Sequence, residues 1–255
     1  MPLLEDRLAL VMGIANKWSL AYAIAQAFSR EGARLVLTYL GSHQKEALAS
    51  LAAGLNVRAM LPCDVTKEDE VEALGRSLDA LGEPLSAVVH SLAFANREDL
   101  AGEFVATSRS GFLLAQEVSA YSLVAVARTA APRMPAGGSI TTLSYLGAVR
   151  VVPHYNVMGV AKASLEASVR YLAHDLGAKG IRVNAISAGP VKTASARAIK
   201  DFSGVLDTVA KRAPLRRVTE PGEVADAAVF LASALGRGVT GNVLYVDSGM
   251  QIMGM

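Results

Sequence analysis

Apolar and polar positions alternate in blocks along the 255 residues of this chain. Short apolar runs, often bounded by glycine or proline, are separated by longer stretches with helical periodicity. The short runs are continuously apolar rather than alternating, which is typical of strands buried on both faces of a parallel sheet. Seven such strands are predicted, at residues 7–13, 33–40, 57–65, 85–93, 138–144, 181–190 and 243–249.

The stretches between these strands predict helices on both faces of the sheet. Ser19 opens the first of them and Gly32 closes it. Others are expected at 43–54, from about residue 67, at 109–131, at 155–177 and at 221–233. No linker or repeat interrupts the pattern. We therefore expect an α/β protein, with residues 1–255 as a single-domain, doubly wound, Rossmann-type fold around a seven-stranded parallel sheet.

One connection, residues 190–211, is long for a compact domain, and long connections are often lids. We predict a substrate-binding lid there. An ordinary surface helix is the alternative.

Composition and charge exclude several classes of function. Although 52% of residues are hydrophobic, we find no uninterrupted apolar run of about 18–20 residues, the length of a membrane span. The net charge is +2 with both signs spread along the chain, so no nucleic-acid partner is expected. Its only cysteine, Cys63, cannot form an internal disulfide and suggests no metal site. The start has no signal-peptide order, and we expect a cytoplasmic protein with no membrane partner.

Candidate cofactor residues lie where successive strands end, the edge at which such sheets bind ligands. Gly13 ends the first strand and Ser19 begins a helix, so a glycine turn and a capping hydroxyl could hold a pyrophosphate. The usual glycine fingerprint is incomplete, and a plain tight turn would look similar. Asp64 could accept a hydrogen bond from an adenine amino group. The remaining candidates at these strand ends are Leu20, Val65, Ser91, Leu92 and Ala93.

The second strand ends in TYLGSHQ, with neither an acidic residue for a ribose diol nor an immediate arginine for a 2′-phosphate. These residues leave the choice between NADH and NADPH open.

The stretch SYLGAVRVVPHYNVMGVAK, residues 144–162, carries the most specific chemistry. Carbonyl reductases place a tyrosine four residues before the lysine, on the same helical face. Met158 occupies that position here and has no proton to donate. Tyr155 lies seven residues before Lys162 and Tyr145 seventeen before it. Tyr155 shares the lysine's face but lies nearer the helix start, where it could reach an oxygen remote from the hydride acceptor. Packing alone is the alternative role for the two tyrosines.

These motifs, with RVNAISAGPVKT and the early SLAYAIA, resemble those of bacterial enoyl-(acyl-carrier-protein) reductases, divergent short-chain dehydrogenases of fatty acid synthesis. The resemblance runs from Arg7 to about Met250. It implies NADH-dependent reduction of the trans-2 double bond of enoyl thioesters on acyl carrier protein, with NADPH possible. It also implies a homotetramer.

The resemblance further implies roles for single residues. Tyr155 would hydrogen-bond the thioester oxygen on which negative charge develops after hydride reaches the β-carbon, and Lys162 would hold the nicotinamide ribose. Tyr145, Tyr155 and Ala95 would bind substrate, with Tyr145 also in the catalytic group. Leu40, Val191 and Thr193 complete the cofactor set.

Two rival functions remain. A carbonyl oxidoreductase on the same fold is disfavoured by Met158, and a non-catalytic dinucleotide sensor by Tyr155 together with Lys162. Ser144 and His154 lack the nucleophile elbow of a hydrolase. His90, on an apolar strand, is interpreted as a structural histidine.

Overall fold

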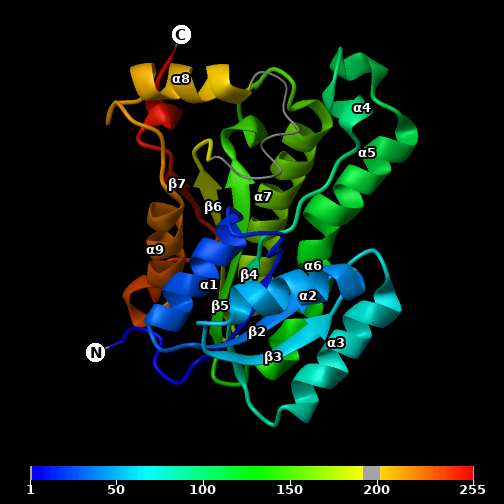
Figure 1. The fold of residues 1–255 in the computed structure, drawn as a ribbon, viewed down its shortest axis with the longest axis vertical. Coiled ribbons are helices and arrows are strands. Elements are labelled where there is room, and N and C mark those ends of the chain that lie inside the picture. The colour runs from blue at the N-terminus through cyan, green and yellow to red at the C-terminus, as the bar shows by residue number, and fades with distance from the viewer. Residues whose placement is uncertain (1, 192–201, 255) are drawn as a thin grey trace.

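Seven parallel strands form one sheet in the order β3-β2-β1-β4-β5-β6-β7 (Figure 1). The computed structural model describes residues 2–191 and 202–254. The strands are β1 (Leu8–Met12), β2 (Arg34–Tyr39), β3 (Val57–Pro62), β4 (Leu85–His90), β5 (Gly138–Tyr145), β6 (Ile181–Ala188) and β7 (Val243–Val246). The predicted seven-stranded parallel sheet is confirmed. Strand order reverses beside β1, so the crevice between β1 and β4 is the expected ligand site.

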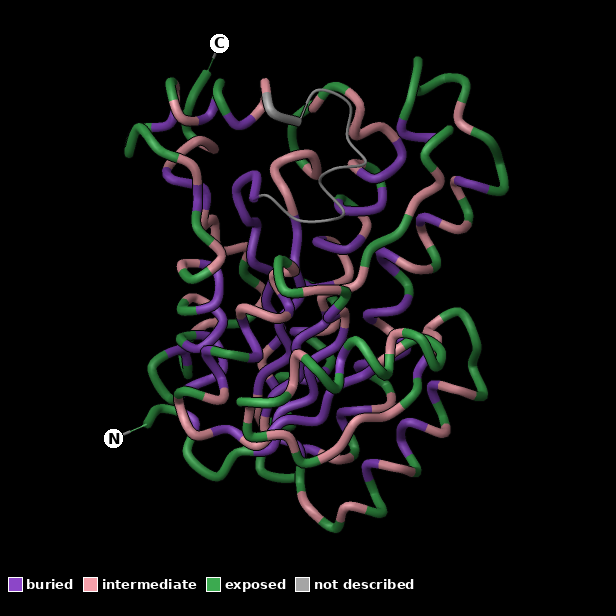
Figure 2. The backbone as a smooth tube through the Cα atoms, viewed as in Figure 1, coloured by how far each residue is buried: buried purple, intermediate pink, exposed green. Residues whose placement is uncertain are grey.

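Helices cover both faces of this sheet. One apolar core lies beneath α3 (Glu68–Ala80), α6 (Ser122–Ala130) and α7 (Asn156–Gly177). A second core lies beneath α1 (Leu20–Arg30), α2 (Gly41–Ala52) and α9 (Pro221–Ala232). Buried backbone is concentrated in the central strands between these layers (Figure 2). The central strand β1 is buried throughout, whereas the edge strands β3 and β7 are only partly covered.

The helix predicted over 109–131 has an unexpected interruption. α5 (Arg109–Gln116) passes into a π-helical turn over Glu117–Tyr121 before α6 begins. A π-turn adds one residue to a helical turn. The apolar periodicity of the sequence continues through this turn, so the pattern does not reveal the added residue. By length and hydropathy the helical run Arg109–Arg133 could cross a membrane, but half of its most apolar window is buried within the fold, as in a core helix.

Two further helices, α4 (Arg97–Leu100) and α8 (Phe202–Arg212), lie on the side of the molecule to which the strands point with their carboxyl ends (Figure 1). α8 occupies the last part of the connection predicted as a lid. The first part of that connection, residues 192–201, lies outside the described residues.

Candidate active site

A groove of about 610 Å³ crosses the carboxyl ends of β1 to β4. Most residues predicted for the cofactor line it. They are Gly13, Ser19, Leu20, Leu40, Asp64, Val65, Ser91, Leu92, Ala93 and Lys162. Strand ends far apart in the sequence therefore meet in one cavity, as the sheet order requires. Val191 is buried but is not among the residues described as lining this groove, and Thr193 lies outside the described residues.

Gly13 shows why the groove begins with a glycine. Its φ is +97°, and a Cβ built there would lie 2.0 Å from the carbonyl oxygen of Ser91. Any larger residue would push the end of β1 away from the end of β4. The missing side chain leaves backbone exposed to a ligand at the switch point of the sheet.

Ser19 occupies the N-cap position of α1, but the prediction that its hydroxyl caps the helix is wrong. The Ser19 hydroxyl donates to the carbonyl of Asn16 at 2.7 Å, and its side chain forms no capping hydrogen bond. The Asn16 side chain in turn accepts from the amide of Trp18 at 2.9 Å. Asn16, which the sequence reasoning missed, thus shapes the loop. Because the first amides of a helix have no partner within it, those at the start of α1 remain suited to an anion.

At the far end of the groove, polar groups are held mainly by their chain neighbours. The amide of Leu40 donates to the side-chain oxygen of Gln44 at 2.8 Å. The carboxylate of Asp64 accepts from the amide and hydroxyl of Thr66 at 3.0 and 2.7 Å. Burial raises the pKa of Asp64, but the Thr66 hydrogen bonds and nearby Lys67 outweigh it and lower the pKa overall. Asp64 is therefore an ionised acceptor, as an amino group would require. Gln44 was not predicted, because its role depends on the local turn.

Lys162 marks the opposite end of the groove. It is only 5% exposed, and its Nζ donates to the carbonyl of Leu143 on β5 at 2.7 Å. Loss of water around the ammonium lowers the pKa of Lys162 to about 8, while the carboxylate of Glu166 one turn later acts in the opposite direction. A buried cation of this kind needs a nearby acceptor or ligand.

Tyr155 and Tyr145 lie together at the start of α7. Their ring centroids are 5.0 Å apart at an interplanar angle of 69°, an edge-to-face pair. Gly147 makes room for the Tyr155 ring, because a Cβ there would lie 2.4 Å from its Cδ1. Gly159 in turn makes room for Gly147, since a Cβ on Gly159 would lie 2.8 Å from the carbonyl oxygen of Gly147. Desolvation raises the pKa of both phenols above the ordinary value of 10.0, so both remain protonated donors near neutral pH.

Met158 lies between Tyr155 and Lys162 along the helix and is buried in an apolar cluster. Its neighbours there include Leu100, Ala115 and Ala161. The position from which a carbonyl reductase would donate a proton is therefore filled by a thioether packed among hydrocarbons.

The backbone on either side of Tyr155 is strained. His154 has φ +62° and Asn156 has φ +35°, both in the left-handed region that glycine favours. The side chain of Asn156 donates to the carbonyl of Gly102 at 3.2 Å and ties the helix start to the loop after α4. Such strain is often found at functional sites. The sequence predicted the helix start at Tyr155 but not this strain, because the residues involved are not glycines.

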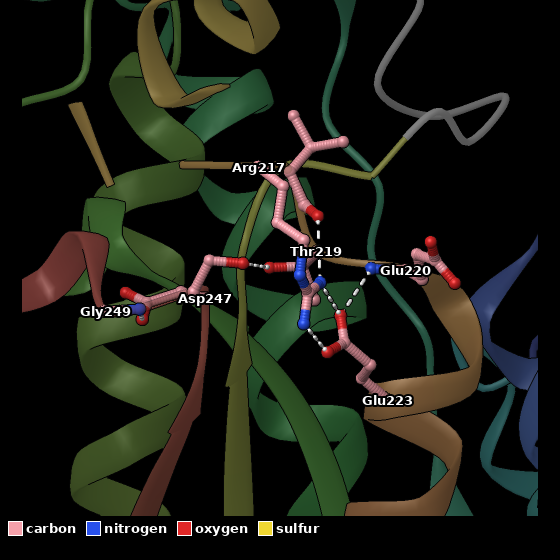
Figure 3. Close-up of polar contacts among 8 residues, drawn as sticks. Arg217, Thr219, Glu220, Glu223, Asp247 and Gly249 are labelled. Carbon is pink, nitrogen blue, oxygen red and sulfur yellow. Dashed lines mark hydrogen bonds and ion pairs between the residues drawn. The ribbon is translucent and has the colours of Figure 1, made fainter. Parts of the chain in front are cut away.

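A separate polar cluster lies beside the chain that follows β6 (Figure 3). A Cβ on Gly189 would lie 2.4 Å from the hydroxyl of Thr219 and 3.0 Å from Cα of Asp247. Arg217 forms a two-point ion pair with Glu223, whose carboxylate also accepts from the amide of Glu220 at 2.9 Å. This packing encloses Gly189, the residue just before the predicted lid at 190–211.

His90 and Ser144 have structural partners. His90 is fully buried, and its ring nitrogens lie 2.9 Å from the hydroxyl of Thr142 and 2.8 Å from that of Ser122. Burial lowers the pKa of His90 to about 3, so the ring is neutral. This agrees with its interpretation as a structural histidine. The hydroxyl of Ser144 donates to Glu166 at 2.5 Å rather than to His154.

These residues fit a nicotinamide dinucleotide. The glycine cradle at Gly13, the free amides of α1 and the Asp64 carboxylate suit the pyrophosphate and adenosine, and buried Lys162 suits ribose hydroxyls. Within residues 2–191 and 202–254, no group of three or more acidic, histidine or cysteine side chains is arranged to hold a metal ion.

A parallel sheet with this switch point, together with a partly buried Tyr155 and a buried Lys162 on the helix after β5, defines the class as a Rossmann-type oxidoreductase related to short-chain dehydrogenases. A family model described as enoyl-(acyl carrier protein) reductase matches residues 13–251. The chain belongs to that family.

Individual relatives agree. A Bacillus cereus protein named enoyl-(acyl-carrier-protein) reductase (NADH) FabI is 54% identical over 256 residues, covering all of both chains. A Staphylococcus aureus relative, 47% identical over 96% of this chain and 97% of its own, is named as the NADPH form. A crystal structure of the Bacillus cereus reductase with NADP⁺ and indole naphthyridinone has a TM-score of 0.98, at 53% identity, and covers both chains fully.

Proposed function

We propose that this protein reduces the trans-2 double bond of enoyl thioesters carried on acyl carrier protein, using a nicotinamide dinucleotide, in the last reductive step of a fatty acid elongation cycle. The observation that carries the proposal is the placement of the proton donor. Tyr155, rather than residue 158, presents a protonated phenol beside Tyr145, and buried Lys162 follows two turns later.

The chemistry of an enoyl thioester suits this displacement. A bound reduced nicotinamide supplies hydride to the β-carbon, and negative charge then develops on the thioester oxygen, two bonds beyond the α-carbon. Tyr155 donates a hydrogen bond to that oxygen. Its raised pKa keeps the proton on the phenol until the oxygen becomes basic.

Lys162 has a different task. Its ammonium, which donates to the carbonyl of Leu143, would hold the ribose hydroxyls of the cofactor and would add positive charge to this end of the groove. Tyr145 packs edge-to-face against the Tyr155 ring. Together with Ala95, which packs against the apolar cluster around Met158, it lines the acyl site.

NADH is the proposed cofactor and NADPH an alternative. Support for NADH comes from the names of relatives such as the Bacillus cereus protein. Support for NADPH comes from the Staphylococcus aureus name and from the NADP⁺ in the Bacillus cereus crystal structure. The Leu40–Gln44 turn, where the two cofactors would differ, contains no acidic or arginine side chain.

The carrier protein is acidic, so a basic rim near the acyl portal should steer it. Lys200 and Arg197 are the sequence-based candidates, and both lie outside the described residues. Lys211 and Arg212, in the last turn of α8, extend the same basic character. We also propose a cytoplasmic homotetramer. In support, the outer faces of α5 to α7 carry exposed Leu113, Tyr121 and Tyr171.

The test is oxidation of NADH, then of NADPH, followed by absorbance with a crotonyl thioester on acyl carrier protein. Saturable oxidation that yields the butyryl thioester is expected. Cofactor binding without reduction would instead support a non-catalytic dinucleotide sensor.

A further inference from the structure

The π-helical turn between α5 and α6 lies directly against the groove. Leu114 and Val118 from this run line the groove, and Ser119 within the turn is completely buried. The hydroxyl of Ser122, just after the turn, donates to the carbonyl of Val118 at 2.6 Å. π-turns occur often at functional sites because the extra residue redirects side chains that a regular helix would place elsewhere.

Ser119 holds the backbone of a single groove residue at two points. Its hydroxyl accepts from the amide of Phe94 at 3.0 Å and donates to the carbonyl of Phe94 at 3.1 Å. Phe94 lies four residues beyond the end of β4, where no strand partner fixes its backbone groups. Without the hydroxyl, the Phe94 backbone loses both anchors. Because Phe94 is half-exposed, water rather than a fixed side chain would then pair with its amide and carbonyl.

Phe94, whose backbone Ser119 holds, lies between the cofactor groove and the acyl side of the site. Ser91 to Phe94 form the groove wall that faces Gly13. The next residue, Ala95, packs against the apolar cluster that contains Met158. Tyr155 packs against the same cluster. The Phe94 backbone therefore joins the cofactor groove to the acyl side of the site.

We propose that Ser119 is a positioning residue for hydride transfer. It fixes the Phe94 backbone and so sets the separation between the cofactor and the double bond. The inference rests on the proposed enoyl reductase function. It assigns to Ser119 the alignment of the two reactants rather than the affinity for either.

Ser119→Ala tests this with a matched control, Ser233→Ala. Ser233 is also buried, and its hydroxyl accepts from the amide of Leu235 at 3.2 Å and donates to the carbonyl of Phe230 at 3.1 Å, at the end of α9. Each variant loses one hydrogen bond from a backbone amide and one to a backbone carbonyl, so a similar fall in Tm is expected. Measurements are made per NADH-binding site, counted by fluorescence titration.

In Ser119→Ala, kcat/KM for crotonyl thioester should fall at least about tenfold, since small misplacements at a reacting centre can cost up to about a hundredfold. NADH affinity should change less than about threefold, because the Gly13 and Asp64 ends of the groove are untouched. The deuterium isotope effect with NADH labelled at the transferred position should rise. Ser233→Ala should retain the wild-type kcat/KM and isotope effect.

Equal kcat/KM in Ser119→Ala and Ser233→Ala would overturn the inference, as would a loss of NADH affinity as large as the loss of turnover. If Ser119→Ala fails to fold, Ser119→Cys keeps the volume with a weaker hydrogen bond and should show a smaller loss in the same direction. Wild-type kinetics in that variant would also overturn the inference. An inactive wild-type protein would instead refute the proposed function, and the inference with it.

Discussion

The two ends of the groove are built by opposite means. At the end near Leu40 and Asp64, polar groups are partly exposed and bonded to close neighbours in the chain. At the end near Lys162 and Tyr155, the chemistry depends on desolvation, which moves the pKa of each group away from its ordinary value. The first end supplies shape and acceptors for binding. The second supplies a poised cation and a protonated phenol for reaction.

The difference implies a division of effects. Changes at Tyr155 should alter turnover and changes at Lys162 should alter the pH dependence of cofactor binding, whereas changes at Gly13 should alter folding and binding together.

Tyr155→Phe should give the largest effect on turnover. Loss of one hydrogen bond to a developing oxyanion costs about 2.7–4 kcal/mol, or about 100- to 1,000-fold in kcat, where that bond dominates. NADH affinity should stay near wild type in a fluorescence titration. Tyr22→Phe, which removes only the phenol bond to the carbonyl of Leu51, is the control. Normal turnover of the carrier-linked substrate by Tyr155→Phe would exclude this tyrosine from the mechanism.

Gly13 lies on the binding side of the groove, away from Tyr155. Gly13→Ala should destabilise or unfold the protein. The new methyl would meet the Ser91 carbonyl, and the residue would be held at φ +97°. Strain and overpacking together cost at least about 2 kcal/mol, measured by denaturant unfolding. Gly41→Ala is the matched control because its φ is +76° but no atom lies within 4 Å of the new methyl. Equal losses in both variants would show that the close approach to Ser91 contributes nothing.

The pH dependence of NADH binding should report Lys162. With its pKa at about 8, the ammonium is lost as pH rises above that value, and affinity should fall by up to about tenfold per pH unit. Stability has the opposite sign. The unfolded lysine binds its proton up to about pH 10.5, so the contribution of Lys162 to stability rises with pH between about 8 and 10.5.

Lys162→Arg, which stays charged, should remove this pH dependence, and Lys162→Ala should weaken NADH binding at every pH. If the alanine variant binds NADH normally, Lys162 has no role in holding the cofactor.

Lys200→Glu should give the smallest effect. It should raise the KM for carrier-linked substrate a few-fold but leave the KM for a small crotonyl thioester unchanged, and added salt should cause the same selective loss. Lys179→Glu is the control. Lys179 is exposed and precedes β6, at the opposite edge of the sheet. A similar change for both substrates would place Lys200 in the pocket or lid instead of the carrier surface.

Much of the binding end could be predicted from sequence because it follows from strand ends. Continuous apolar runs predicted the strands. Gly13 and Ser91 follow β1 and β4 directly, and Asp64 lies two residues after β3. The hydroxyl of Ser19 was predicted wrongly, since its bond to Asn16 depends on the course of the loop. Gln44 was missed for the same reason.

Less of the reacting end could be predicted. The Tyr–Lys spacing and the helix start at Tyr155 are visible in the sequence, but the left-handed His154 and Asn156 are not, because neither residue is glycine. The π-turn is hidden by uninterrupted apolar periodicity. Its one signal is the pair of serines, Ser119 and Ser122, within an otherwise apolar helix, and buried serines of this kind usually have specific partners.

The most direct test of the displaced donor is a single-turnover comparison of two thioesters on the same carrier, one enoyl and one 3-keto. With NADH bound in stoichiometric amounts, the enoyl thioester should oxidise it in one rapid phase. The ketone should not, because Met158 provides no proton beside a carbonyl carbon. Rapid oxidation of NADH by the ketone, at a rate equal to or above that with the enoyl thioester, would contradict the account.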